Sequence, residues 1–184
     1  MDETRETVVT IGDADRGRAP NFTLENCQFF GKPNFSGVMD QFKDSRRKFT
    51  VVIPRAAMEP LRKFGYNVKE TIPDAEQVAM GREPICHLKV MLNFKIPDDK
   101  KGLPNEIDFE TGPDIFIMQG EDVERINSLT VGVLDRTRFD NIDLEIRGWE
   151  FDREEQPGVL SARLVQFVGV MRPKMLANKY GNLR

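Results

Sequence analysis

Apolar and polar residues alternate most strictly between residues 142 and 152, in the sequence IDLEIRGWEFD. One side of this alternation carries three aliphatic residues, Ile142, Leu144 and Ile146. The other side carries a guanidinium and two aromatic rings, those of Arg147, Trp149 and Phe151. A period of two residues predicts a β-strand with one buried face. The second face is a candidate binding platform, because bases stack on flat rings and guanidinium groups. The alternative is that a second layer of the same protein covers Trp149.

Comparable patterns predict further strands. They cover residues 22–30, 48–54, 87–96, 114–119 and 159–171, with shorter strands at 8–11 and 66–69. The ranges 142–152 and 159–171 are expected to form an antiparallel hairpin. Helical spacing predicts a short helix over 55–64 and one or two helical turns within 122–135. Polar stretches with proline or glycine, 73–84 and 97–112, are expected to be loops.

These elements predict a mainly β protein. About five main strands with short helices between them favour an OB-like, five-stranded, partly open β-barrel with loop elaborations. A β-sandwich is the alternative. A chain of 184 residues is sufficient for one domain with a sizeable core. We expect a flexible N-terminal arm at residues 1–20, an OB-like nucleic-acid-binding domain at 21–172 and a basic C-terminal tail at 173–184.

Composition limits the partners that the whole molecule attracts. Lys and Arg number 27 against 30 Asp and Glu, so the formal net charge is −3 and nucleic-acid binding requires a local basic patch. The two cysteines, Cys27 and Cys86, have no CxxC spacing and are expected to be buried, reduced thiols. We expect no signal peptide, because the acidic first 20 residues contain no apolar h-region, and no membrane span, because no apolar run reaches that length. A soluble protein of the cytoplasm is expected, with no membrane partner.

No motif in the sequence predicts catalysis. Phosphate-binding loops, dinucleotide-binding glycine patterns and nucleophile elbows are all missing from the sequence. The single histidine, His87, lacks the further ligands of a zinc site and is expected to be structural or at the surface. Acidic clusters in the predicted loops would support a metal-dependent nuclease only if their carboxylates converged in space. We therefore expect no catalytic residue, no metal site and no cofactor.

Basic and aromatic residues are interleaved in two regions. Residues 43–48 carry four positive charges and one negative charge immediately before a predicted strand, among the phenylalanines Phe35, Phe42 and Phe49. Lys89 and Lys95 form a second stripe on the polar side of the strand 87–96. A groove for a single nucleic-acid strand combines such cations with stacking rings. With the pair from strand 142–152, the candidate nucleic-acid-binding residues are Phe35, Arg46, Arg47, Lys48, Lys89, Lys95, Arg147 and Trp149. The alternative is that Phe42 and Phe49 belong to the core and the charges only solvate a loop.

The order of short motifs resembles a family of bacteriophage proteins. The motifs are Asn34-Phe35-Ser36-Gly37, Phe42, RKFTVVI at 47–53, Leu61 with GYNVK at 65–69, and NIDLEIRGW at 141–149. Members of this family are regarded as single-stranded-DNA-binding proteins with an OB-type barrel, and the resemblance spans roughly residues 34–170. Many single-strand-binding proteins end in an acidic tail with an aromatic tip. This chain ends in KMLANKYGNLR, which argues against recruitment of partners through such a tail.

The resemblance implies a non-catalytic protein that coats single-stranded DNA in phage replication or recombination, inside the infected host cell. The expected partners are single-stranded DNA and phage or host replication and recombination proteins. A homodimer formed through an edge strand is a further expectation. The alternative is a phage structural or host-modulating protein-interaction module, which would use an exposed sheet face or edge.

Overall fold

The structure is a computed structural model that describes residues 6–14, 18–150 and 158–172. Strands dominate the chain, so the expectation of a mainly β protein is confirmed. The strands are β1 (Val8–Ile11), β2 (Phe22–Glu25), β3 (Lys48–Ile53), β4 (Lys69–Thr71), β5 (Ile85–Met91), β6 (Asp114–Gln119), β7 (Asp122–Ile126), β8 (Asn141–Glu150) and β9 (Leu160–Met171). The helices are α1 (Arg55–Lys63) and α2 (Ala75–Ala79), and the 3-10 turns are η1 (Asp98–Lys100), η2 (Glu106–Phe109) and η3 (Val131–Arg136).

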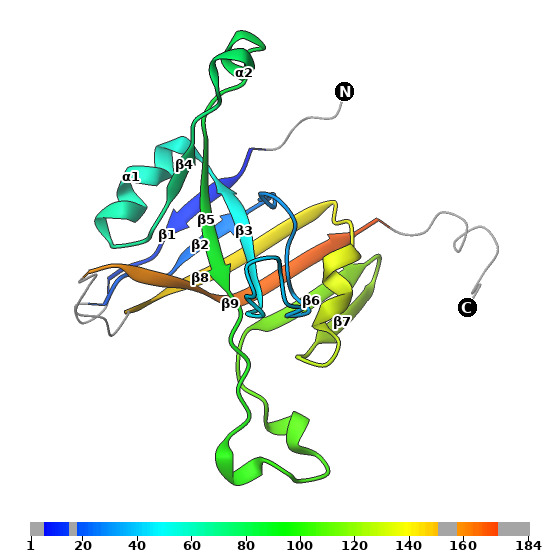
Figure 1. Cartoon of the computed structure of the whole chain (residues 1–184). Coiled ribbons are helices and arrows are strands. Elements are labelled where there is room, and N and C mark those ends of the chain that lie inside the picture. The colour runs from blue at the N-terminus through cyan, green and yellow to red at the C-terminus, as the bar shows by residue number, and fades with distance from the viewer. Residues whose placement is uncertain (1–5, 15–17, 151–157, 173–184) are drawn as a thin grey trace, which may run out of the picture.

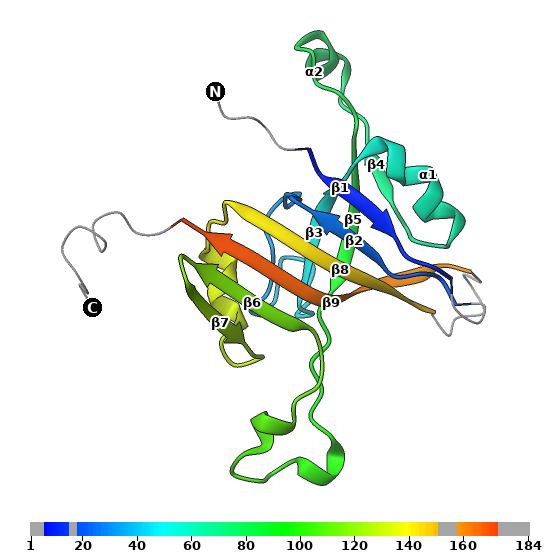
Figure 2. The same ribbon diagram turned by 180° about the vertical axis from the view of Figure 1, so that it is seen from behind.

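All of these strands belong to one sheet of nine strands, more than the five main strands expected. The main path runs β1-β2-β8-β9-β5-β3, while β4 pairs with β5, and β6 pairs with β7 and β9 (Figure 1). Seen from behind, β1, β2, β8, β9 and β6 lie side by side (Figure 2). The long strand β9 pairs with β8 in the antiparallel sense, as expected, and in parallel with β5 near its start and β6 near its end. The sheet is not closed.

Residues 27–34 belong to no named strand and link β8 to β3 through backbone hydrogen bonds. The backbone N–H of Cys27 donates to the carbonyl of Ile142 in β8 (2.9 Å). A few residues later, the N–H of Phe30 donates to the carbonyl of Thr50 in β3 (2.8 Å), and Asn34 and Lys48 form an isolated bridge. Residues 27–34 therefore run from β8 to β3 and are hydrogen-bonded to both strands.

The core lies on the concave side of this curved sheet. Alternate residues of β3 and β8 are buried, as their period of two predicts. The rings of Phe29, Phe35, Phe49 and Phe167 pack together, with centroids 5.3–6.4 Å apart. Cys27 and Cys86 are buried and unbonded to one another, as expected. No helix of the described residues is both long and apolar enough to cross a membrane.

Three local expectations need correction. The helical turns predicted within 122–135 are wrong for 122–126, which form β7. A two-residue turn with Gly120 at φ 62° pairs β7 with β6. The loop predicted at 73–84 contains α2, which begins with a capping box of Asp74 and Gln77. The strand predicted at 87–96 begins at Ile85 and ends at Met91.

Parts of the expected termini lie outside the described residues. Within the expected N-terminal arm, Val8–Ile11 forms the anticipated short strand and pairs with β2. Residues 1–5 and 15–17 of that arm, the basic tail at 173–184, and Phe151 are outside the description.

Candidate nucleic-acid interface

Polar and basic side chains share the outer face of β3, β5, β9 and β8. Residues that are directly opposite one another in a sheet point to the same side. The opposing sets are Thr50 with Lys89, Val52 with His87, Lys48 with Met91 and Arg163, Arg163 with Arg147, and Ser161 with Trp149. The intervening residues of β3, Phe49 and Val51, are buried in the core. We call this surface the outer face.

The Trp149 end of the outer face holds an unusual pair of arginines. The guanidinium carbon of Arg163 lies 4.3 Å from the centroid of the Trp149 ring, and that of Arg147 lies 5.6 Å from it. Arg163 Nε is buried and has no hydrogen-bond partner among the described residues. Burial, and then the neighbouring charge of Arg147, lower the pKa of Arg163. A bound anion would reduce the repulsion between these two like charges, so the surface beside the exposed ring is a candidate anion site.

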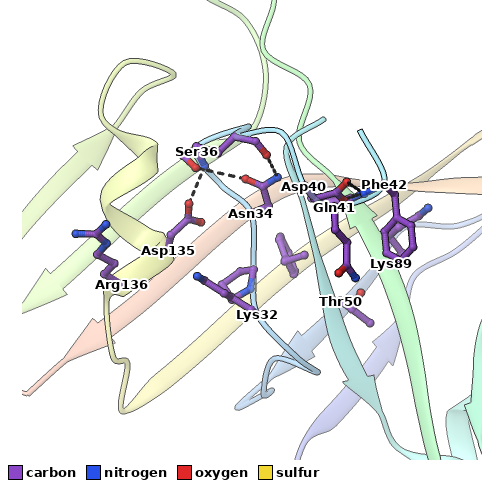
Figure 3. Close-up of a pocket in the computed structure, with 14 residues that line it drawn as sticks. Lys32, Asn34, Ser36, Asp40, Gln41, Phe42, Thr50, Lys89, Asp135 and Arg136 are labelled. Atoms are coloured by element: carbon purple, nitrogen blue, oxygen red, sulfur yellow. Dashed lines mark hydrogen bonds and ion pairs between the residues drawn. The ribbon is translucent and has the colours of Figure 1, made fainter. Parts of the chain in front are cut away.

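Lys89 lies between two hollows of the outer face. The first, of about 800 Å³, is lined by Lys32, Pro33, Asn34, Ser36, Val38, Asp40, Gln41, Phe42, Lys48, Phe49, Thr50, Lys89, Asp135 and Arg136. We call it hollow A. Figure 3 shows Lys32 and Asn34 between Asp135 and Arg136 on one side and Phe42 with Lys89 on the other. Burial, followed by the charges of Arg46, Lys48 and Lys69, lowers the pKa of Lys89.

The second hollow, hollow B, has a volume of about 460 Å³. Its lining is Arg46, Thr50, Asn67, Lys69, His87, Leu88, Lys89, Met91, Asn93, Val159, Leu160, Ser161, Ala162 and Arg163. Four of these residues are basic and none is acidic. Lys69, Lys89 and Arg163 form no ion pair with another residue that the structure describes. Hollow B therefore carries concentrated positive charge on a protein whose net charge is negative.

His87 forms a flat stack at the edge of hollow B. Its ring lies parallel to that of Phe30, with centroids 4.3 Å apart and an interplanar angle of 2°. Nε2 of His87 is 2.8 Å from Oγ1 of Thr71, a hydrogen bond whose direction depends on the tautomer. Burial, and then the charge of Lys69, lower the pKa of His87. The neutral form of the ring is thus favoured.

The loop before β3 folds around two carboxylates. Asp44 accepts hydrogen bonds from Arg46 Nη2 (2.7 Å) and Lys48 Nζ (2.6 Å), which hold the pKa of Asp44 far below its usual range. Asp40 accepts from the backbone N–H groups of Phe42 and Asp44. This arrangement exposes 81% of Phe42 at the loop apex. Arg46 lines hollow B and Lys48 lines hollow A, and both are ion-paired with carboxylates of this loop. The exposed ring of Phe42 also lines hollow A.

Some of the residues predicted for the site do not belong to it. Phe35 is wrong, because its ring is fully buried against Phe49 and Phe167. Arg47 lies elsewhere: its guanidinium donates to the carbonyl of Ser128 (2.8 Å) and lies over the Phe94 ring. Lys95 lines a separate hollow together with Arg47. The remaining predicted residues, Arg46, Lys48, Lys89, Arg147 and Trp149, share the outer face and its rim.

Sequence reasoning did not select several residues of this interface. They are Phe30, Lys32, Lys69, Arg136 and Arg163. For Arg163 a signal was available, because Ser161 and Arg163 occupy the polar positions of the strand 159–171. No group of three or more His, Cys, Asp or Glu in the described part of the chain is placed to hold a metal ion.

Comparisons with known proteins return distant similarities only. No protein-family model matches the chain, and no curated protein does. Among solved structures, a C-terminally truncated single-stranded DNA-binding protein from bacteriophage Enc34 is similar at a TM-score of 0.46 and 10% identity, covering 90% of this chain and 96% of the other. The same Enc34 protein in complex with single-stranded DNA is similar at a TM-score of 0.45 and 11% identity, covering 88% of this chain and 94% of the other.

Proposed function

We propose that the outer face binds single-stranded DNA without catalysis and with little sequence preference. One observation carries this proposal: three basic side chains that line hollow B form no ion pair with another described residue. They are Lys69, Lys89 and Arg163, and Arg163 lies against the exposed ring of Trp149. Cations placed this way follow a phosphate backbone, and the ring stacks on a base. The proposal does not require a positive net charge, because the charge is concentrated where the strand would lie.

The open face suits unpaired bases. Trp149 and Phe42 expose 49% and 81% of their surface, and each borders basic residues of the interface. Rings exposed in this way stack on bases that are not already paired and stacked in a duplex. Stacking accepts every base, so little sequence preference is expected. A preference for single strands over duplex DNA follows.

The strand connections support an OB-like interpretation of the fold. Five segments are consecutive neighbours, as in a partly open barrel. They are β2 with its continuation 27–34, then β8, β9, β5 and β3. OB folds bind oligonucleotides on the face of their second and third strands, which correspond here to β3 and β5. That is the face that carries Lys89 and both hollows. We infer from this placement, and from the phage-like motifs of residues 34–170, that the chain coats single-stranded DNA in phage replication or recombination.

A titration tests the proposal directly. A fluorescein-labelled oligothymidine of about 30 nucleotides, long enough for at least one site, is titrated at two salt concentrations. We expect a rise in anisotropy that weakens steeply with salt, together with quenching of Trp149, the only tryptophan. A duplex of equal length is the control and should bind more weakly. The absence of binding at low salt would refute the proposal.

A further inference from the structure

The solvent side of the sheet continues beyond the proposed interface onto β2, β6 and the other ends of β8 and β9. These strands lie side by side when the molecule is seen from behind (Figure 2). Strand register gives the side chains on this surface, which we call the rear face. One row is Thr23, Glu145, Gln166 and Asp114, and the next is Asp143, Val168, Phe116 and Arg125. Glu25 follows two residues after Thr23 and therefore lies on the same side of β2.

Three carboxylates meet in one hollow of the rear face. This hollow, hollow C, has a volume of about 140 Å³ and is lined by Thr23, Glu25, Asp143, Leu144, Glu145, Gln166 and Val168. Its lining contains three acidic residues and no basic one. Glu25, Asp143 and Glu145 form no ion pair with another residue in the described part of the chain. Hollow C therefore carries the opposite charge to hollow B.

Hydrogen bonds hold two of these carboxylates in position. Oδ1 of Asp143 accepts from the backbone N–H of Asn26 (2.8 Å), and Oε1 of Glu145 accepts from Nδ2 of Asn21 (3.2 Å). Neither donor carries a charge, so both hydrogen bonds leave the negative charge of the carboxylate uncompensated. The only basic side chain in the two rows is Arg125, and it forms an ion pair with Asp114 (2.7 Å).

The sign of the surface charge changes between Glu145 and Arg147 of β8. Side chains two residues apart on a strand share a face and lie about 7 Å from one another. On the neighbouring strand β9, Arg163 is opposite Arg147 and Gln166 is opposite Glu145, with a register shift between the two pairs. A separation of about 7 Å is shorter than the Debye length of about 10 Å at 0.1 M salt. A phosphate bound at Arg147 is therefore close enough to be repelled by Glu145.

We propose that hollow C ends the path of the DNA strand at Arg147 and so limits the number of nucleotides that one copy of the protein binds. This inference rests on the proposed function and names the border of that same site. Hollow B and Arg147 attract phosphates, whereas hollow C repels the phosphates that would follow them. The strand therefore leaves the sheet beside Trp149 instead of crossing β8 onto β2.

Charge reversal in hollow C tests this border. The variant Glu25→Lys/Asp143→Lys/Glu145→Lys extends the basic surface across β8 onto β2. Its binding is measured with oligothymidines of about 4 to 16 nucleotides, the range of site sizes on one OB fold, at several salt concentrations. The affinity of the unmodified protein should stop rising at a strand length about three nucleotides shorter than that of the variant, one for each added phosphate contact. The slope of log K against log salt should be steeper by about 2 in the variant.

Two further variants control for net charge and for folding. Glu59→Lys/Glu76→Lys/Glu121→Lys makes the same change of net charge at exposed carboxylates of α1, α2 and the turn between β6 and β7, and it should leave the limiting strand length unchanged. Glu25→Gln/Asp143→Asn/Glu145→Gln keeps the hydrogen-bond acceptors of hollow C. It should bind the strand of 16 nucleotides about 2–5-fold more tightly at low salt, because repulsion is removed, with no steeper slope.

The outcomes distinguish the binding site from its border. If the unmodified protein binds none of these strands at low salt, the proposed function itself is refuted. If it binds them and charge reversal in hollow C changes neither the limiting length nor the slope, or the matched control changes both equally, the border proposal is overturned. Should the reversed variant not fold, the amide variant decides the question, because an unchanged affinity for the strand of 16 nucleotides would show that hollow C does not repel the DNA.

Discussion

Arg163 lies with its guanidinium carbon 4.3 Å from the centroid of the Trp149 ring, while its Nε has no hydrogen-bond partner among the described residues. The charge of Arg147 is directly opposite on the neighbouring strand. A partly buried guanidinium beside a like charge costs folding free energy unless an anion joins it. Arg163 is therefore expected to have opposite effects: it lowers the stability of the free protein and strengthens the binding of an anionic ligand.

Replacing Arg163 should reveal that opposition. We expect Arg163→Met to raise the free energy of unfolding by about 1 kcal/mol, because it removes a partly buried guanidinium that has no ion-pair partner among the described residues and keeps the packing volume. The same change should weaken binding to oligothymidine and reduce the slope of log K against log salt by about 0.7, the value for one phosphate contact on a single strand. Chemical denaturation and salt-dependent anisotropy measure the two effects. A variant that is destabilised and binds normally would contradict this account of Arg163.

Trp149 should contribute to binding through stacking rather than through stability. Because about half of its surface, 49%, is exposed, Trp149→Ala should change the free energy of unfolding little. It should weaken DNA binding by about 1–3 kcal/mol, the range for one base stacked on an aromatic ring. Trp149→Phe keeps a flat ring and is expected to restore most of the affinity. Equal affinities for the alanine variant and the unmodified protein would remove Trp149 from the interface.

Lys89 should act through charge alone. Lys89→Gln is expected to weaken binding equally on all base sequences and to reduce the salt slope by about 0.7. Lys63→Gln is the matched control, because Lys63 is an exposed lysine on α1, away from the outer face. Anisotropy titrations over a range of salt concentrations give both slopes. The same loss of slope in both variants would show that the effect is general to the net charge of the protein and not specific to the groove.

Local periodicity predicted those parts of the fold whose residues alternate between core and solvent. In β3 and β8 the alternation is visible in the sequence, and both strands are close to their predicted ranges. β7 has no such pattern, because four of its five residues are exposed and only its pairing with β6 makes it a strand. α2 buries no residue, so no apolar periodicity predicts it, and the capping box of Asp74 and Gln77 is the sequence signal for its start. Strand pairing and end capping are not visible to a search for periodicity.

The same limit applies to the site. Alternation placed Trp149, Arg147 and Lys89 on polar faces, and register then brought them onto one surface. Phe35 and Arg47 lie outside the regular strands, where no alternation predicts which side of the sheet a side chain faces. Their positions depend on long-range contacts: the ring of Phe35 enters the core, and Arg47 reaches Ser128.

The buried position of Phe35 gives a prediction about stability. Because the ring is fully buried, Phe35→Ala should lower the free energy of unfolding by about 3–5 kcal/mol. Phe35→Leu keeps most of the volume, so it should remain folded and bind oligothymidine with unchanged affinity. Chemical denaturation and anisotropy distinguish the two roles. A folded Phe35→Leu variant with weakened binding would return this residue to the interface.

His87 should make DNA binding depend on pH. Its pKa in the folded protein is lowered from 6.5 by burial and by Lys69, so the unfolded chain takes up a proton first as the pH falls. The contribution of His87 to stability is therefore complete above pH 6.5 and decreases as the pH falls through that value toward the folded pKa.

A phosphate in hollow B would raise the pKa of the His87 ring, so DNA binding takes up a proton and strengthens at lower pH, by less than about tenfold per pH unit. Since His87 is the only histidine, His87→Phe, which retains a ring beside Phe30, should remove most of the dependence between about pH 6 and 8. Anisotropy titrations across this range measure it, and an affinity that falls on acidification would place the phosphate away from His87.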